Sequence, residues 1–240
     1  MVGDERAAHI DLTKWKNFPS QEFSTKFYAR LPDIINLINR KISEMYDFIF
    51  VFGFHWDFVC MEHDDRSGIN LMHLRPNIDM NDLTDTVILK TQKWKRLFPE
   101  TDIIWITPHP PDILTYNSSL LKQLKMSYSD NIMKKNFCEQ VSKYWYYSED
   151  IFKKLLNHPD VNVFSLNTVL FFKQPKLVKS FTGLVEPRFP DGFLKDGFGF
   201  TSKAIMYFGD LILDYLTNFL SKKSKTKLTK KTKRKSSDNV

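Results

Sequence analysis

The sequence predicts an α/β domain with three layers, in which helices flank a mostly parallel sheet. Short apolar runs without polar alternation, at residues 47–52 and 102–107, are typical of strands buried on both faces. Segments with helical apolar spacing lie between such runs, and this alternation is the pattern of a parallel sheet covered by helices. A chain of 240 residues that is 42% hydrophobic has the composition of one globular domain.

Two amphipathic helices are predicted in the first half of the chain. Apolar residues recur at helical spacing over residues 31–45 and again over residues 83–97, where Pro99 ends the pattern. Met1 and Val2 are expected to form a truncated first strand, which a Gly-Asp turn follows. The polar stretch that precedes the second helix is expected to be a solvated acidic loop.

The second half of the chain predicts three helices and a further strand. Residues 129–130 are expected to cap one helix, and a separate helix is expected to start at residues 148–150 and to end before Pro159. Residues 161–166 predict a short strand. Thr201 is expected to cap a final helix that carries an apolar stripe.

Charge is distributed unevenly along the chain. The 35 Lys and Arg outnumber the 28 Asp and Glu, but residues 221–240 alone hold nine basic residues and one acidic residue. We therefore predict a folded domain over residues 1–220 and a disordered basic tail over residues 221–240. Residues 42–121 have 6 basic and 12 acidic side chains, whereas residues 122–203 have 13 and 8. A fold that separates these halves has a basic face, which favours polyanion binding.

The cysteine and hydropathy patterns favour a cytoplasmic protein. Cys60 and Cys138 are too few for a disulfide framework and are expected to be inert core residues in a reducing compartment. The first twelve residues lack the apolar segment of a signal peptide. The longest apolar run, residues 48–54, is far shorter than the ~18 residues of a membrane helix. No membrane partner is expected, and the basic tail leaves a nuclear location open.

Three segments are expected at the carboxyl edge of the sheet, where open α/β domains place functional residues. Gly3-Asp4-Glu5 follows the first strand, Gly53-Phe54-His55-Trp56-Asp57 follows the second, and Asp196-Gly197-Phe198-Gly199 precedes the last helix. This layout resembles the SGNH (GDSL-type) hydrolase family, which carries Gly-Asp-Ser, Gly-x-Asn-Asp and Asp-x-x-His blocks at these places. The resemblance covers most of residues 2–220 and implies an SGNH-hydrolase-like fold.

The residues that this family uses for catalysis are replaced. Glu5 stands at the nucleophile position, His55 stands near the position of the oxyanion asparagine, and Gly199 stands at the position of the histidine base. Asp196 alone keeps its identity. Because the members of a catalytic triad act as a unit, the pattern implies a degenerate esterase without activity.

Three kinds of active site are alternatives to an inactive esterase at this edge: a displaced nucleophile, a carboxylate pair and a metal site. An active ester hydrolase would need a displaced nucleophile, and Ser20, Ser24 and Ser202 are the nearby hydroxyls. Glu5 and Asp196 are a candidate carboxylate pair for acid–base work. The histidines and aspartates of residues 55–73 match no compact metal-ligand spacing, and the glycines form no phosphate-binding loop, so neither a metal nor a cofactor is predicted.

The lost catalytic residues, the basic half and the basic tail are also similar to the OSK domain family of the insect germ-plasm protein Oskar. That resemblance implies RNA as the partner, namely 3′ untranslated regions of maternal messages, together with germ-plasm proteins. The candidate RNA contacts are basic side chains of the positive half: Arg188, Lys195, Lys134, Lys135, Lys153 and Lys154. The alternative without RNA is a scaffold that binds other proteins.

A cluster of aromatic residues adds a second kind of RNA contact. Tyr144 continues the apolar stripe of its predicted helix and is expected to be buried. Its neighbours Trp145, Tyr146 and Tyr147 are candidates for stacking on an unpaired base. Packing against a neighbouring helix is the alternative for each of them.

Overall fold

The computed structural model describes residues 2–3, 29–44, 46–126, 131–166, 177–179, 185–187 and 193–237. Four parallel strands form its main sheet, in the order β1-β2-β5-β6. These strands are β1 (Val2–Gly3), β2 (Phe48–Phe52), β5 (Asp102–Thr107) and β6 (Asn162–Ser165). The predicted α/β class with a parallel sheet is confirmed.

Alternate residues of the strands face two separate hydrophobic clusters. The long helices are α2 (Leu31–Lys41), α4 (Met80–Leu97), α6 (Asn131–Leu156) and α8 (Ser202–Ser237). Val51 and Trp105 belong to a cluster that includes residues of α2, α4 and α6. Phe50 and Ile104 belong to a cluster with residues of α8. Burial of both side-chain sets explains why these strands show no polar alternation in the sequence.

Helix α6 is continuous where the sequence predicts two helices. Ser148, at the predicted start of the second one, is fully buried in the middle of α6. Its hydroxyl donates to the carbonyl oxygen of Pro108 at 2.6 Å. The serine therefore satisfies a buried carbonyl just after β5 instead of capping a helix start.

An antiparallel hairpin replaces part of the predicted acidic loop. It consists of β3 (Val59–Asp64) and β4 (Ile69–Leu74) and is followed along the chain by α4. Asn117, a buried residue of α5 (Ile113–Gln123), accepts from the Met72 amide at 2.8 Å and donates to the Met72 carbonyl at 2.9 Å. The Gln140 side chain of α6 accepts from the Leu74 amide at 2.7 Å. Two side-chain amides thus pair with the edge of β4 as a further strand would.

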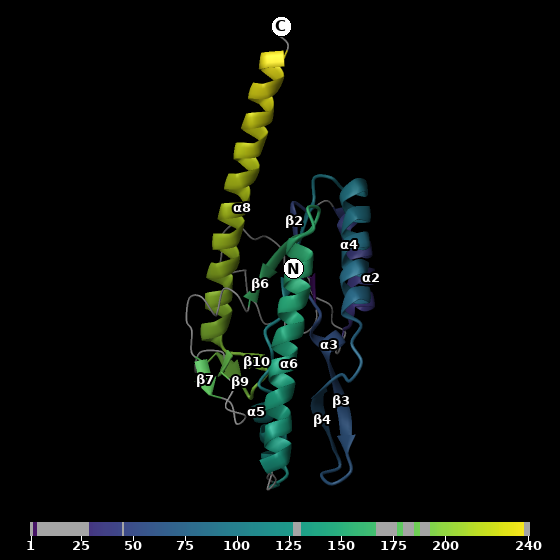
Figure 1. Ribbon diagram of the computed structural model, residues 1–240, viewed down its shortest axis with the longest axis vertical. Helices are drawn as coiled ribbons and strands as arrows, with labels where there is room; N and C mark the ends of the chain where they lie inside the picture. Colours follow the sequence, from purple (N-terminus) through teal and green to yellow (C-terminus); the bar gives the residue numbers. More distant parts are fainter. Residues whose placement is uncertain are drawn as a thin grey trace.

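Helix α8 extends past the predicted domain boundary. The Thr201 hydroxyl accepts from the Ala204 amide at 3.3 Å, as expected of a cap. Lys223 forms a 2.6 Å ion pair with Asp102, at the amino end of β5. The helical backbone continues to Ser237 and projects beyond the other elements, where the sequence predicts a disordered tail (Figure 1). Lysine is a good helix former, so a run of lysines can extend a helix that is already anchored.

A buried carboxylate holds the start of α2. Asp57, on the short helix α3 (His55–Phe58), is 2% exposed. It accepts from the Leu31 amide at 2.9 Å and from the Arg30 guanidinium at 3.4 Å. Burial raises the pKa of Asp57, and these hydrogen bonds oppose that rise. The expected position of Asp57 in a solvated loop is therefore wrong.

No helix in the described part of the chain combines the length and the hydropathy needed to cross a membrane.

Substitution of Asp57 tests this contact. Asp57→Ala leaves the buried Leu31 amide without its acceptor, and we expect the free energy of unfolding to fall by about 1–3 kcal/mol. Asp57→Asn keeps an acceptor and should cost less. Because burial raises the pKa of Asp57, the folded state binds a proton more tightly than the unfolded chain does.

The stability of the wild type relative to Asp57→Asn should therefore fall as the pH rises from the ordinary aspartate pKa through the raised one. Urea denaturation of the three proteins across that pH range measures both effects. Equal stability of the wild type and Asp57→Ala would contradict the assigned role.

Candidate functional site

Two of the three segments expected at the carboxyl edge of the sheet lie against each other. His55 begins α3 just after β2, and the Asp196–Gly199 turn connects β9 (Leu194–Lys195) to β10 (Gly199–Phe200). The centroids of the His55 and Phe198 rings are 4.9 Å apart. Glu5, which belongs to the third segment, lies outside the described residues.

The His55 side chain is enclosed by aromatic rings. It is 0% exposed, and its Nδ1 lies 2.9 Å from the Tyr144 hydroxyl. The ring centroids of Trp56 and Tyr144 lie 4.8 and 5.8 Å from that of His55. Phe198 also contacts Tyr116, with the centroids 5.8 Å apart. We call this group, which consists of His55, Trp56, Tyr116, Tyr144 and Phe198, the aromatic plug.

A close backbone contact holds the Asp196–Gly199 turn in place. The Asp112 amide donates to the Gly197 carbonyl at 2.8 Å. Gly197 has a φ of +74°, and a Cβ there would lie 2.5 Å from the Asp112 oxygen and 2.6 Å from the Tyr116 nitrogen. Only glycine fits this position, because a side chain would meet both unfavourable torsion and backbone atoms. The turn therefore packs closely against the start of α5, next to the aromatic plug.

Other residues toward the carboxyl edge of the sheet form hydrogen bonds with nearby groups. Asp196 is exposed, and the Ser119 hydroxyl donates to it at 3.5 Å. Gly199 offers no side chain and pairs with Lys195 in the β9–β10 ladder. The Ser165 hydroxyl, at the end of β6, donates to Glu149 at 3.2 Å. The hydroxyl groups of Ser119 and Ser165 thus each donate to a carboxylate.

The histidines expected in the acidic loop are dispersed. His55 is buried in the plug, His63 is exposed on β3, and His73 lies on β4 opposite Cys60. Burial lowers the pKa of His73 and raises the pKa of the Cys60 thiol. In the part of the chain that the structure describes, no three metal-ligating side chains gather at one place.

The predicted RNA contacts lie on separate elements. Lys195 is exposed on β9, beside the plug, whereas Lys153 is exposed near the carboxyl end of α6. Lys154 donates to Asp150 at 2.8 Å and to the Asn81 side chain at 2.9 Å. The side chains of Lys134 and Lys135 on α6, and all of Arg188, lie outside what the structure describes.

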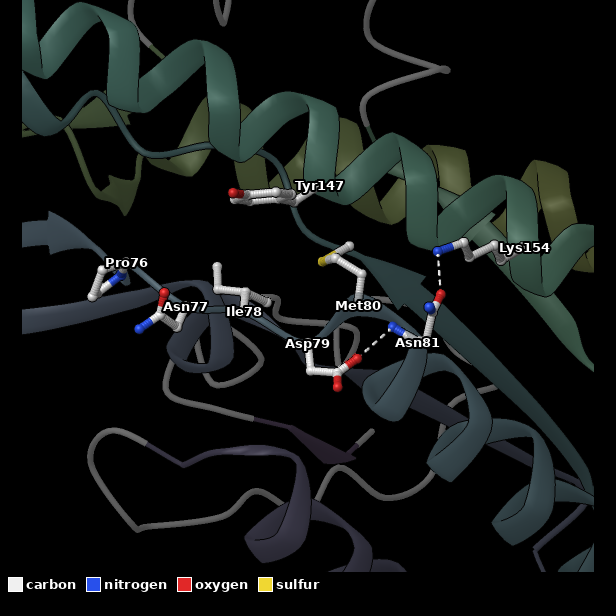
Figure 2. Close-up of a pocket in the computed structure, with 8 residues that line it drawn as sticks. All are labelled: Pro76, Asn77, Ile78, Asp79, Met80, Asn81, Tyr147 and Lys154. Carbon is white, nitrogen blue, oxygen red and sulfur yellow. Dashed lines mark hydrogen bonds between the residues drawn. The ribbon is translucent and has the colours of Figure 1, made fainter.

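A groove of about 650 Å³ lies between α6 and the segment that leads into α4 (Figure 2). Eight residues line it: Pro76, Asn77, Ile78, Asp79, Met80, Asn81, Tyr147 and Lys154. Tyr147 and Lys154 are predicted RNA contacts that the structure brings to one place. The sequence does not predict a function for residues 76–81, because they form no recognisable catalytic or ligand-binding motif.

Comparisons with known proteins bear on the fold alone. No protein-family model matches the chain, and no curated protein matches it. A solved structure from Streptococcus pneumonia, provisionally described as that of a platelet activating factor, is similar with a TM-score of 0.51. The similarity covers 90% of this chain and 81% of that one, at 13% sequence identity. It supports the α/β fold of this chain, and the resemblances to the SGNH hydrolase and OSK domain families stay predictions.

The position of the turn can be tested at its glycine. Gly197→Ala should lower the free energy of unfolding by more than the ~1–2 kcal/mol that a left-handed alanine costs, because the new methyl group also meets backbone atoms. Gly68→Ala is the matched control, since Gly68 has a similar φ of +69° with open space around it. Equal losses at the two sites in urea denaturation would contradict the close packing of the turn.

Proposed function

We propose that this chain is a catalytically inactive, SGNH-hydrolase-like domain with three layers, and that it binds RNA. The resemblance to the OSK domain family makes the 3′ untranslated regions of maternal messages the first RNAs to test. A cytoplasmic germ-plasm setting, with germ-plasm proteins as further partners, belongs to the same proposal.

The enclosed imidazole of His55 carries the inactive part of the proposal. A general base must reach the proton that it removes, at about 2.6–3.2 Å from its own nitrogen or through one water. The rings of Trp56, Tyr144 and Phe198 surround His55, and it has no exposed surface. Gly199, at the position that resembles the family's base, has no group that takes up a proton.

Exposed lysines and the extension of α8 support RNA as the partner. Lys153 and Lys195 are exposed. The nine basic residues of 221–240 all lie within the helical stretch that ends at Ser237. Lysine attracts phosphate as a point charge, and neutralised phosphates release counterions, which favours binding.

An esterase assay tests the inactive part of the proposal. With p-nitrophenyl acetate, we expect the purified chain to show no turnover above the rate in buffer, because no described imidazole at the carboxyl edge is accessible. Turnover that disappears on substitution of Ser20, Ser24 or Ser202 by alanine would identify a displaced nucleophile and overturn the proposal.

The salt dependence of RNA binding tests the other part. We expect the affinity for single-stranded RNA to fall with salt, with a slope of log K against log[salt] of about −0.7 per phosphate contact. A variant of the full chain with glutamine at the basic positions of 225–235 keeps Lys223 for its ion pair with Asp102. It should bind with a smaller slope.

Each outcome of that titration has a defined meaning. Residual binding by the glutamine variant supports an RNA contact on the folded body. Complete loss of binding would restrict the RNA contacts to the extension of α8 and contradict an RNA-binding site on residues 1–220. Absence of salt-sensitive binding in the wild type would favour a scaffold that binds proteins.

A further inference from the structure

We infer that the groove between α6 and residues 76–81 holds one unpaired RNA base, stacked on the ring of Tyr147. This inference rests on the proposed RNA binding and names a site for it. The same groove is distant in sequence from the segments that resemble hydrolase blocks, and the aromatic plug does not contribute to its lining.

Tyr147 provides a fixed stacking surface. The tyrosine is half-buried, and the centroid of its ring lies 6.0 Å from that of Phe58, which is fully buried. Across the groove, the ring of Tyr147 faces Ile78 and Met80 (Figure 2). A flat base therefore meets an aromatic ring on one side and aliphatic side chains on the other, which is how proteins hold an unstacked base.

The charge of the groove favours a base over a phosphate group. The Asp79 carboxylate accepts from the Asn81 and Asp82 amides at 3.0 and 2.9 Å, and Asp150 pairs with Lys154. Two acids and one lysine leave no surplus positive charge for a phosphate.

Side-chain amides supply groups that can recognise the edge of a base. Asn77 is exposed at the groove, and its amide both donates and accepts hydrogen bonds. Asn81 is held in place by the Lys154 ammonium at 2.9 Å. Lys153, exposed one residue before Lys154 on α6, is a candidate for contact with the phosphate backbone of the same strand.

Tyrosine variants of the full chain test the stacking. Fluorescence anisotropy with a labelled single-stranded RNA of mixed sequence should show a loss of affinity of about 5- to 150-fold for Tyr147→Ala, the equivalent of one lost stack. Tyr147→Phe should bind like the wild type. Tyr146→Ala is the matched control, because Tyr146 neighbours Tyr147, is 64% exposed and does not line the groove. It should also bind like the wild type.

A second variant avoids the packed tyrosine. Asn77 is exposed, so Asn77→Ala should leave thermal stability unchanged while it alters the ranking of oligo(A), oligo(C) and oligo(U) affinities. Should Tyr147→Ala fail to fold, ultraviolet crosslinking of the wild type to 4-thiouridine RNA replaces it. Crosslinked peptides should then contain Tyr147 or residues 76–81.

The outcomes separate this inference from the function on which it rests. If the wild type does not bind RNA, the proposed function fails and the groove has no RNA to hold. If the wild type binds RNA and Tyr147→Ala matches Tyr146→Ala, the groove is not the site, although RNA binding stands. Crosslinks confined to peptides outside the groove, or an unchanged base ranking in Asn77→Ala, would also overturn the inference.

Discussion

The contact between the Gly197 turn and the start of α5 determines what the carboxyl edge of the sheet can do. The Asp112 amide and the Gly197 carbonyl, 2.8 Å apart, bring the backbone closer than any side chain at residue 197 would allow. Phe198 follows directly and is directed onto His55, Trp56 and Tyr116. A single backbone approach thus places an aromatic ring at the edge where open α/β domains usually bind ligands.

The residues that stabilise the domain are distinct from the groups that could catalyse a reaction at that edge. The Asp57 cap, the buried strands and the Lys223–Asp102 pair hold the elements together, and none of them needs an accessible imidazole or hydroxyl. The α/β fold therefore does not depend on catalytic groups at this edge, because different residues carry stability and chemistry. The groove beside Tyr147, which the plug does not line, is the surface that we propose for binding.

The sequence predicts the elements of the main sheet well, because their apolar runs report burial directly. It also places His55 near the Asp196–Gly199 turn, since carboxyl ends of parallel strands share one edge. The β3–β4 hairpin was missed because its edge is completed by Asn117 and Gln140, whose contribution depends on tertiary contacts. The role of Phe198 could not be predicted either, because spacing does not show which side chain fills a crevice.

Because α6 is continuous through Ser148, Tyr147 and Lys154 lie on the same side of one helix and line one groove. Tyr144, Ser148, Ile151 and Leu155 repeat at helical spacing and are fully buried. Tyr147 and Lys154, seven residues apart, lie two turns from each other on one flank of the same helix and both reach the groove. Two helices would give these side chains independent directions. The unbroken helix, in which the buried Ser148 hydroxyl bonds to the Pro108 carbonyl, keeps the ring of Tyr147 and the Lys154 side chain on one flank, along one groove.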